Sequence, residues 1–436
     1  MADGVTQSAM RFPGTRAVII SVFVILALYG LEAYARNREH STPGVLGDQT
    51  AYLGYARHLY DSNYAVTEDR NRMPIYPFLL SLIYRPGMSE DEFLVRAQTF
   101  TVSLSILLLA ILFLIFRQFF PPLPALGLLA ATAFGVFIYR AGKAQVELLF
   151  YFVSFCAFVF LLQLFVRPRW WLAMLAGATI GLAHLTKASV LPGLAVWAVV
   201  FAAGIIWNTD RWRRLGILVL VITSFFAVIF PYIQTSKRIY DSYFYNVNST
   251  FVMWCDSSTE AYEFLSAHGD KDKWREVPPE ERPSFRKYWR EHAVAEMVRR
   301  VWSGARNLTT KNLRVIAYYK FVLVLLVTAV VLCVWRWRAA RELFAEHQFP
   351  AIFSVLFFAA YFVLYAWYDQ ISNDARFALS MFLPFVCATS LFVLRLERKR
   401  VVFIAGRSFR FDEFFGVLML GLSMIDVLYN APGLFR

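Results

Sequence analysis

The apolar run AVIISVFVILALYGLEAYA, residues 17–35, decides the fold class of this chain. It is long enough to cross the hydrocarbon of a bilayer as a helix. Similar runs recur along the sequence: hydrophobic residues make up 58% of the 436 positions, and the mean hydropathy is +0.49. Only helices and closed barrels satisfy their backbone hydrogen bonds in lipid, and these runs lack the alternation of barrel strands. The sequence therefore predicts an all-α polytopic membrane protein.

About eleven spans are predicted, all within one transmembrane domain that covers residues 1–436. The first run follows Arg11 and Arg16 but ends in no clean small-residue cleavage site, so we interpret it as an uncleaved span and not as a signal peptide. The predicted spans are residues 17–35, 97–116, 123–138, 147–166, 170–186, 189–207, 215–233, 315–335, 349–367, 376–394 and 414–430.

The basic residues of the short loops set the predicted orientation, because such residues concentrate on the cytoplasmic side. With a cytoplasmic N-terminus, every arginine-rich short loop is also cytoplasmic: those with Arg117, with Arg167 and Arg169, and those at 211–214, 336–341 and 395–410. Topology thus explains most of the net charge of +13, which gives no support for nucleic-acid binding.

Two polar regions then face the opposite side, residues 36–96 and residues 234–312. Aromatic and aliphatic residues recur in both at helical spacing, which predicts amphipathic helices along the membrane surface. In the second region an apolar stripe is formed by Val294, Met297, Val298, Val301 and Trp302. The chemistry of the protein is expected in these two regions.

Cysteine and histidine indicate no site of their own. Three of the four cysteines lie in predicted spans and one lies in the second polar region, so they provide no disulfide framework. The six histidines lack metal-ligand spacing.

Charged residues at the external ends of the spans form the strongest functional signal. Each alone could be a solvated or snorkelling side chain, but their coincidence at one depth suits a substrate with its lipid tail in the bilayer and its phosphate and sugar outside. They are Asp48, Arg72, Lys143, Glu147, Lys187, Asp374 and Arg376.

Four segments carry a family resemblance: GDQTAYLGYARHLY (47–60), RMPIYPFLL (72–80), GLAHLTK (181–187) and RFALSMFLP (376–384). In this order and on this topology, the chain resembles the GT-C class of integral-membrane glycosyltransferases. Within that class it is most similar to the superfamily of protein O-mannosyltransferases and the aminoarabinose transferase that modifies lipid A.

The resemblance implies an inverting glycosyltransferase that moves a sugar from a polyprenyl-phosphate-linked donor to an acceptor hydroxyl. The acceptor would be a glycolipid, a surface polysaccharide or a protein. The enzyme would lie among the lipids of the cytoplasmic (inner) membrane and work on its periplasmic or exterior face. Region 36–96 would carry the catalytic acid, and region 234–312 would contact the acceptor.

Carried over residue by residue, the resemblance makes Asp48 the general base and places Arg72 and Lys187 on the donor phosphate. The residue types agree with this chemistry, since inverting displacement needs one carboxylate for the acceptor proton and cations for the departing phosphate. Five further residues are substrate-binding candidates: Lys143, Glu147, Arg376, Tyr52 and Arg70.

Several alternatives stay open at this point. Asp48 could simply cap the helix that follows it, and Glu147 could pair with Lys143 four residues earlier. Gln49 stands where many O-mannosyltransferases have a second acid, so no cofactor is certain and a divalent metal is left open. A membrane transporter and a non-catalytic lipid-binding or assembly protein are the competing classes, although no internal repeat supports transport.

Overall fold

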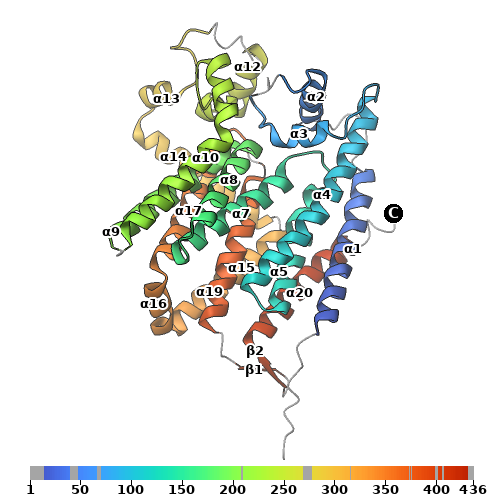
Figure 1. Ribbon diagram of the computed structural model, residues 1–436, viewed down its shortest axis with the longest axis vertical. Coiled ribbons are helices and arrows are strands. Elements are labelled where there is room, and N and C mark those ends of the chain that lie inside the picture. Colours follow the sequence, from blue (N-terminus) through green and yellow to red (C-terminus); the bar gives the residue numbers. More distant parts are fainter. Residues whose placement is uncertain are drawn as a thin grey trace, which may run out of the picture.

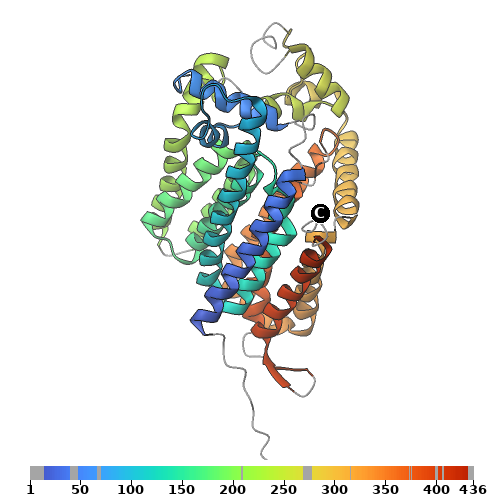
Figure 2. The same cartoon turned by 90° about the vertical axis from the view of Figure 1, so that its right-hand side faces the viewer.

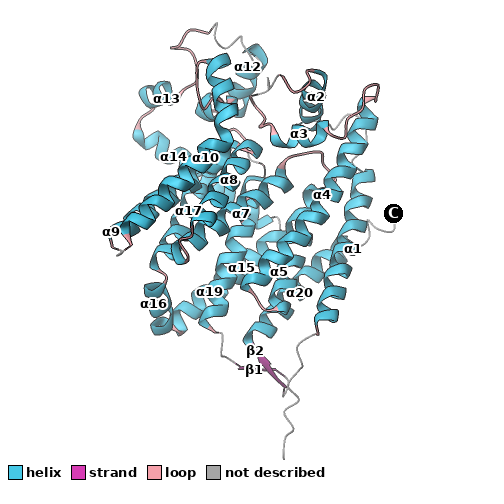
Figure 3. Cartoon of the chain, viewed as in Figure 1, coloured by secondary structure: helices cyan, strands magenta, loops and turns pink. Residues whose placement is uncertain are grey.

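The chain is almost entirely helical, with one two-stranded hairpin, as Figure 3 shows. This computed structural model describes residues 14–39, 48–65, 70–207, 210–268, 277–314, 316–372, 374, 376–397, 401–404 and 407–430. The expected all-α fold is confirmed for these residues.

Long apolar helices form a bundle whose axes run broadly along the long direction of the molecule (Figures 1 and 2). They are α1 (Thr15–Glu39), α4 (Glu90–Phe119), α5 (Pro122–Thr132), α7 (Glu147–Val166), α8 (Trp170–Thr186), α9 (Leu191–Ile206), α10 (Arg211–Tyr240), α15 (Ile316–Trp335), α17 (Gln348–Tyr368), α19 (Phe382–Leu396) and α20 (Phe411–Asn430).

The short elements of the two predicted external regions gather at one end of this bundle (Figure 1). They are α2 (Asp48–Asp61), α3 (Ile75–Ser81), α11 (Val247–Thr250), α12 (Ser258–His268) and α13 (Phe285–Glu291). At the opposite end lie α16 (Trp337–Glu346) and the antiparallel strands β1 (Val401–Ile404) and β2 (Arg407–Arg410). The arginines of α16 and β2 therefore lie at the end opposite to these elements of the two polar regions.

Each predicted span coincides in most of its described residues with helix, but the count of eleven is not confirmed. Eight helices of the described chain are long and apolar enough to cross a membrane, counting α5 together with its continuation to Ala141, and α8 and α19 are shorter apolar helices. The protein is thus an integral multi-pass membrane protein. Residues 376–394 were expected to be one span, and this was wrong: α18 (Arg376–Leu379) ends before α19 begins at Phe382.

The local sequence explains where the long helix α4 begins. Ser89 accepts the backbone N–H of Glu92, and the Glu92 side chain accepts the N–H of Ser89, which forms a capping box. Its 30 residues span roughly 45 Å, more than the hydrocarbon thickness of about 30 Å. The helix is therefore long enough to extend beyond the hydrocarbon, and its acidic first turn lies at the same end as α2 and α3.

Polar contacts also join helices inside the bundle. The Tyr29 hydroxyl of α1 donates a hydrogen bond to the Ser105 hydroxyl of α4 at 2.8 Å. Lys320 of α15 pairs with Asp426 of α20, and both side chains are largely buried. A charge in lipid is costly unless it is paired, so this ion pair fixes α20 against α15.

The amphipathic helix α14 (Val294–Arg314) packs on α17 instead of lying free on the surface. Gly304 lets the two helices meet, because a Cβ atom there would lie only 1.8 Å from the Ala366 carbonyl oxygen. The predicted apolar stripe is divided: Met297 is buried, whereas Val294, Val298 and Trp302 stay exposed for contact with lipid. An interfacial helix with an apolar outer face is consistent with this arrangement.

We expect Gly304→Ala to lower the free energy of unfolding by about 1–3 kcal/mol, because the added methyl group forces α14 away from α17. Gly421→Ala in α20 is the matched control, since a Cβ atom there meets nothing within 4 Å. Thermal unfolding of the two purified variants in detergent measures the difference. Equal melting temperatures would contradict the close approach of α14 and α17.

Candidate functional site

A cavity of about 400 Å³ lies where the external elements meet the ends of the bundle helices. Its charged lining comes from five separate places in the chain: the start of α2, the loop before α3, the start of α7, the end of α8 and the start of α18. The corresponding residues are Asp48, Arg72, Glu147, Lys187 and Arg376. With Tyr52, which also lines the cavity, six of the eight site residues expected from the sequence are brought together here.

The Asp48 carboxylate is held between two arginines. Its Oδ1 accepts a hydrogen bond from Arg72 Nη2 at 3.2 Å, and its Oδ2 accepts one from Arg376 Nη1 at 2.6 Å. Burial alone would raise the pKa of Asp48, but the hydrogen bonds and charges of Arg376 and Arg72 outweigh it and hold the pKa below its ordinary value. Asp48 is thus ionised at neutral pH and can accept a proton.

Asp48 is the first helical residue of α2, one position inside the N-cap that the helix-cap interpretation assigned to it. The hydrogen bonds described for this carboxylate nevertheless go to arginines far away in the sequence. Its position at the first turn of α2 places a negative charge at the positive end of the helix dipole. The structural and the chemical interpretations of Asp48 are therefore compatible.

Glu147 supplies a second carboxylate, and it is almost fully buried at the first turn of α7. Its Oε1 lies 3.5 Å from Arg376 Nη1 and 3.7 Å from Lys187 Nζ. The expected ion pair between Lys143 and Glu147 is wrong. Lys143 lies in the turn before α7, and no ion pair joins it to Glu147 in the described chain. A local i to i+4 pair requires one continuous helix, and here the helix starts only at Glu147.

The remaining three expected site residues lie at the cavity or outside it. Tyr52 does line the cavity, with its ring 5.7 Å from the Arg72 guanidinium. Arg70 is fully buried away from the cavity, where its guanidinium lies 4.1 Å from the Tyr232 ring centre. Lys143 is partly buried and is not part of the lining. The structure thus places Tyr52 at the cavity and the other two outside it.

Two charged residues behind the cavity extend the network. Asp374 Oδ1 accepts a hydrogen bond from Arg140 Nη2 at 2.5 Å and another from the backbone N–H of Arg376 at 2.9 Å. Asp374 was among the charges expected at this face, but Arg140 was missed. The available signal was an arginine at the external end of a span, where the positive-inside rule does not favour one.

Gln49 is turned away from the cavity, which explains why an amide stands beside Asp48. Its Oε1 accepts a hydrogen bond from the backbone N–H of Ala144 at 2.8 Å and one from Gln98 Nε2 at 3.4 Å. The side chain therefore ties α2 to α4 and to the turn before α7. Position 49 has a structural role in this chain.

The donor set does not fit a divalent metal ion. Asp48, Glu147 and Asp374 each lie against a guanidinium or an ammonium group, which neutralises the negative charge that Mg²⁺ or Mn²⁺ would require. Of the two Glu147 oxygens, Oε1 faces these cations, and Oε2 has no hydrogen-bond partner among the described residues. No cluster of three His, Cys, Asp or Glu side chains suited to a metal occurs among the residues that the structure describes.

One part of the cavity wall carries neutral polar side chains. Asn248 donates to Asn71 through its amide nitrogen, and its Oδ1 accepts a hydrogen bond from the Tyr368 hydroxyl at 3.1 Å. Asn246 fixes the same loop through a 3.0 Å hydrogen bond to the Arg70 carbonyl oxygen. Asn246 and Asn248, from region 234–312, thus contribute uncharged hydrogen-bonding groups to the lining.

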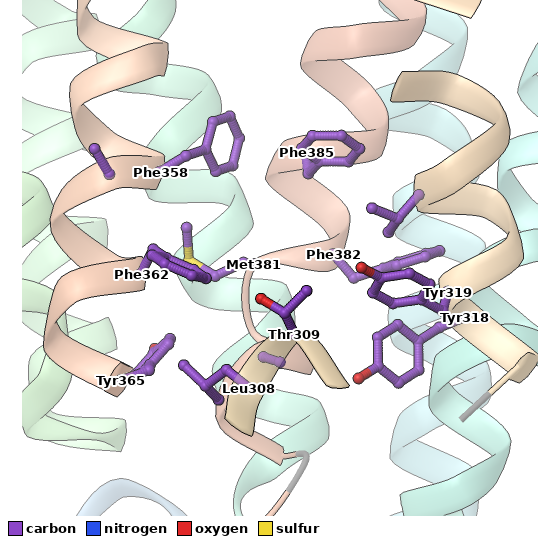
Figure 4. Close-up of a pocket in the computed structure, with 13 residues that line it drawn as sticks. Leu308, Thr309, Tyr318, Tyr319, Phe358, Phe362, Tyr365, Met381, Phe382 and Phe385 are labelled. Carbon is purple, nitrogen blue, oxygen red and sulfur yellow. The ribbon is translucent and has the colours of Figure 1, made fainter. Parts of the chain in front are cut away.

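A second cavity of about 410 Å³ lies between α14, α15, α17 and α19, and its lining is mostly apolar. Figure 4 shows aromatic side chains around it, with Phe358 and Phe362 facing Phe382 and Tyr319 across the space. Tyr365 borders both cavities, and Phe377 and Ala378 are neighbours on opposite sides of the boundary. A charged chamber and an apolar chamber thus adjoin at Tyr365.

Comparison with known proteins identifies the fold. No protein-family model matches the sequence, and no curated protein matches it. The chain resembles the solved structure of the archaeal oligosaccharyltransferase AglB from Archaeoglobus fulgidus, in complex with an inhibitory peptide and a dolichol-phosphate, with a TM-score of 0.52 and 14% sequence identity. The match covers 94% of this chain but 56% of AglB, so the chain spans little more than half of that protein.

A second match is ArnT from Cupriavidus metallidurans, bound to undecaprenyl phosphate. It covers 83% of this chain and 78% of ArnT at 15% identity, and its TM-score of 0.34 is too low to carry weight. The AglB match shows over most of the chain the fold of the GT-C membrane glycosyltransferases, as the sequence motifs led us to expect.

We expect Asp48 to stabilise the protein in a pH-dependent way. Its lowered pKa means that the stabilisation is present above the unfolded-state pKa of about 3.9 and is lost as the pH falls through the folded-state pKa. The melting-temperature difference between wild type and Asp48→Asn should therefore be largest near neutral pH and shrink below about pH 4. A difference that is constant with pH would contradict the arginine-paired carboxylate.

Proposed function

From this shared fold, we propose that the chain is an inverting glycosyltransferase with a polyprenyl-phosphate-linked sugar as donor. The observation that carries the proposal is the Asp48 carboxylate, which is held by Arg72 and Arg376 in a chamber adjoining an apolar one. Such a site can bind the lipid tail in the apolar chamber and the phosphate and sugar in the charged chamber. The acceptor hydroxyl would belong to a glycolipid, a surface polysaccharide or a protein.

In the proposed reaction, the acceptor oxygen attacks the anomeric carbon while the bond from this carbon to the phosphate oxygen breaks. The phosphate leaves with the bonding electrons, and the Asp48 carboxylate takes the proton of the attacking hydroxyl. Arg72, Arg376 and Lys187 stabilise the charge that develops on the phosphate. No further reactant is needed for this balance.

The charge of the site supports a phosphate ligand. Four cationic side chains and three carboxylates form the network, which leaves one positive charge: Arg72, Arg140, Lys187 and Arg376 against Asp48, Glu147 and Asp374. A polyprenyl phosphosugar is a phosphodiester with one negative charge, so its binding neutralises the site. Charges that are shielded from water are retained at lower cost when they sum to zero.

Donor binding would also prepare the base. A phosphate that engages Arg72 and Arg376 competes with Asp48 for the same N–H groups. Loss of these partners raises the pKa of the Asp48 carboxyl and makes it a stronger base. The carboxylate would thus become reactive only when the sugar donor is present.

The apolar cavity beside Tyr365 is suited to the isoprenoid chain of the donor. It adjoins the charged chamber, which would hold the phosphate, and it lies among bundle helices where a hydrocarbon chain replaces lipid. The neutral wall around Asn248 would face the sugar and the acceptor. By the positive-inside rule, this end of the molecule is the extracytoplasmic one, in the cytoplasmic membrane.

We expect Asp48→Asn to abolish sugar transfer, with a loss of about a hundredfold or more, because the proton acceptor is removed. Binding of undecaprenyl phosphate to the purified variant should be at least as tight as in wild type, since the arginines lose a competitor. Mass spectrometry of surface glycolipids and polysaccharides, from a deletion strain complemented with each variant, measures transfer.

The control for this experiment is Asp61→Asn, an exposed residue at the other end of α2. It should restore the full modification. A fully active Asp48→Asn variant would refute the role of Asp48 as base, and label accumulating in vesicles without a covalent product would indicate transport.

We expect Ala359→Trp, at the rim of the apolar cavity, to weaken binding of undecaprenyl phosphate about tenfold, because the indole takes space needed by the isoprenoid chain. Geranyl phosphate, whose chain is too short to fill the cavity, should bind as before. Val355→Trp is the control, since this exposed α17 residue is not part of the lining. An equal effect of Ala359→Trp on both ligands would refute this placement of the chain.

A further inference from the structure

Among the described residues that line the cavity, Arg376 alone faces three carboxylates. Its Nη1 lies 2.6 Å from Asp48 and 3.5 Å from Glu147, and both of these residues line the cavity. The third carboxylate, Asp374, lies outside the lining, and its Oδ2 is 3.5 Å from Arg376 Nε. The two edges of one guanidinium thus face different groups.

Asp374 holds Arg376 at both its backbone and its side chain. Its Oδ1 accepts the Arg376 backbone N–H at 2.9 Å, while its Oδ2 faces Nε. The Arg376 carbonyl oxygen in turn accepts a hydrogen bond from the Tyr151 hydroxyl at 2.8 Å. Arg376 is therefore fixed from behind, and its Nη1 edge is directed toward Asp48 and the cavity.

Asp374 is itself braced by Arg140, which lies 234 residues earlier in the chain. The Arg140 side chain is only 11% exposed and sits in α6 (Ile138–Ala141), directly after a π-helical turn at Ala133–Phe137. Each π-turn adds one residue and so rotates the residues that follow by roughly 100° relative to an unbroken α-helix. This turn changes the direction of the helix face that carries Arg140.

We infer that Asp374, braced by Arg140, is a positioning residue that keeps Arg376 in place while Arg376 exchanges Asp48 for the donor phosphate. The inference rests on the proposed function. When phosphate takes the Nη1 edge, the 2.6 Å contact with Asp48 is lost, and Glu147 at 3.5 Å is the remaining cavity carboxylate. A long arginine side chain stays ordered through this exchange only if another contact restrains it.

The direction in which Asp374→Asn changes phosphate affinity distinguishes a positioning role of Asp374 from a purely electrostatic effect of its charge. Asp374→Asn removes a negative charge near the phosphate site, so electrostatics alone would tighten phosphate binding. Positioning predicts the opposite: the dissociation constant for undecaprenyl phosphate should rise about ten- to hundredfold, the range expected for a lost charged hydrogen bond. Binding is measured on the full-length protein in detergent, with circular dichroism as the check of folding.

Further variants test the link to Arg140. Arg140→Lys keeps the charge but loses the planar fork, and it should weaken binding in the same direction as Asp374→Asn. In the double variant Arg140→Gln with Asp374→Asn, the loss should equal that of Asp374→Asn alone, because Arg140 acts through Asp374. Lys237→Gln, which breaks an exposed ion pair with Asp241 beside the same external region, is the control and should bind as wild type.

The outcomes distinguish the two proposals. If wild type does not bind undecaprenyl phosphate, the proposed function is refuted. If wild type binds it and folded Asp374→Asn binds equally well or more tightly, only the positioning role is refuted. Should Asp374→Asn fail to fold, Arg140→Lys decides: unchanged binding in that variant overturns the inference.

Discussion

The contact between Asp48 and Arg376 joins parts of the chain that are 328 residues apart. One partner begins the first helix of the external region, and the other begins the short helix α18 that precedes α19. Arg72 and Glu147 add the loop before α3 and the start of α7 to the same point. The arrangement of the external elements over the bundle depends on this network, because each of its charges is stabilised by neighbours from other segments.

Removing these charges from water at the edge of a membrane costs free energy, and pairing each charge with one of opposite sign reduces that cost. Glu147 is almost completely buried, so it is compatible with its surroundings only beside Arg376 and Lys187. Each carboxylate of the network is paired with at least one arginine or lysine. The single surplus positive charge is then available for an anion, which links the stability of the free protein to the ligand that it would bind.

The bundle contributes a second, apolar chamber that adjoins the charged one at Tyr365. Its walls come from α14, α15, α17 and α19, and α14 can reach α17 because Gly304 has no side chain. A phosphate head and a hydrocarbon tail require opposite environments within a few ångströms. The fold provides them by placing a break between α18 and α19 where the two chambers meet.

The sequence by itself determined the helical membrane fold, the two polar regions and the residue types of the site, because hydropathy and charge act locally along the chain. Asp48, Arg72, Lys187 and Arg376 could be chosen on these grounds together with the family motifs. The tertiary structure alone decided the pairings: Glu147 meets Arg376 and Lys187 instead of Lys143, Arg70 is packed under Tyr232, and Arg140 enters the network. The reason is physical: a buried charge selects its partner by distance and solvation, and both depend on how separate helices pack, which no local pattern encodes.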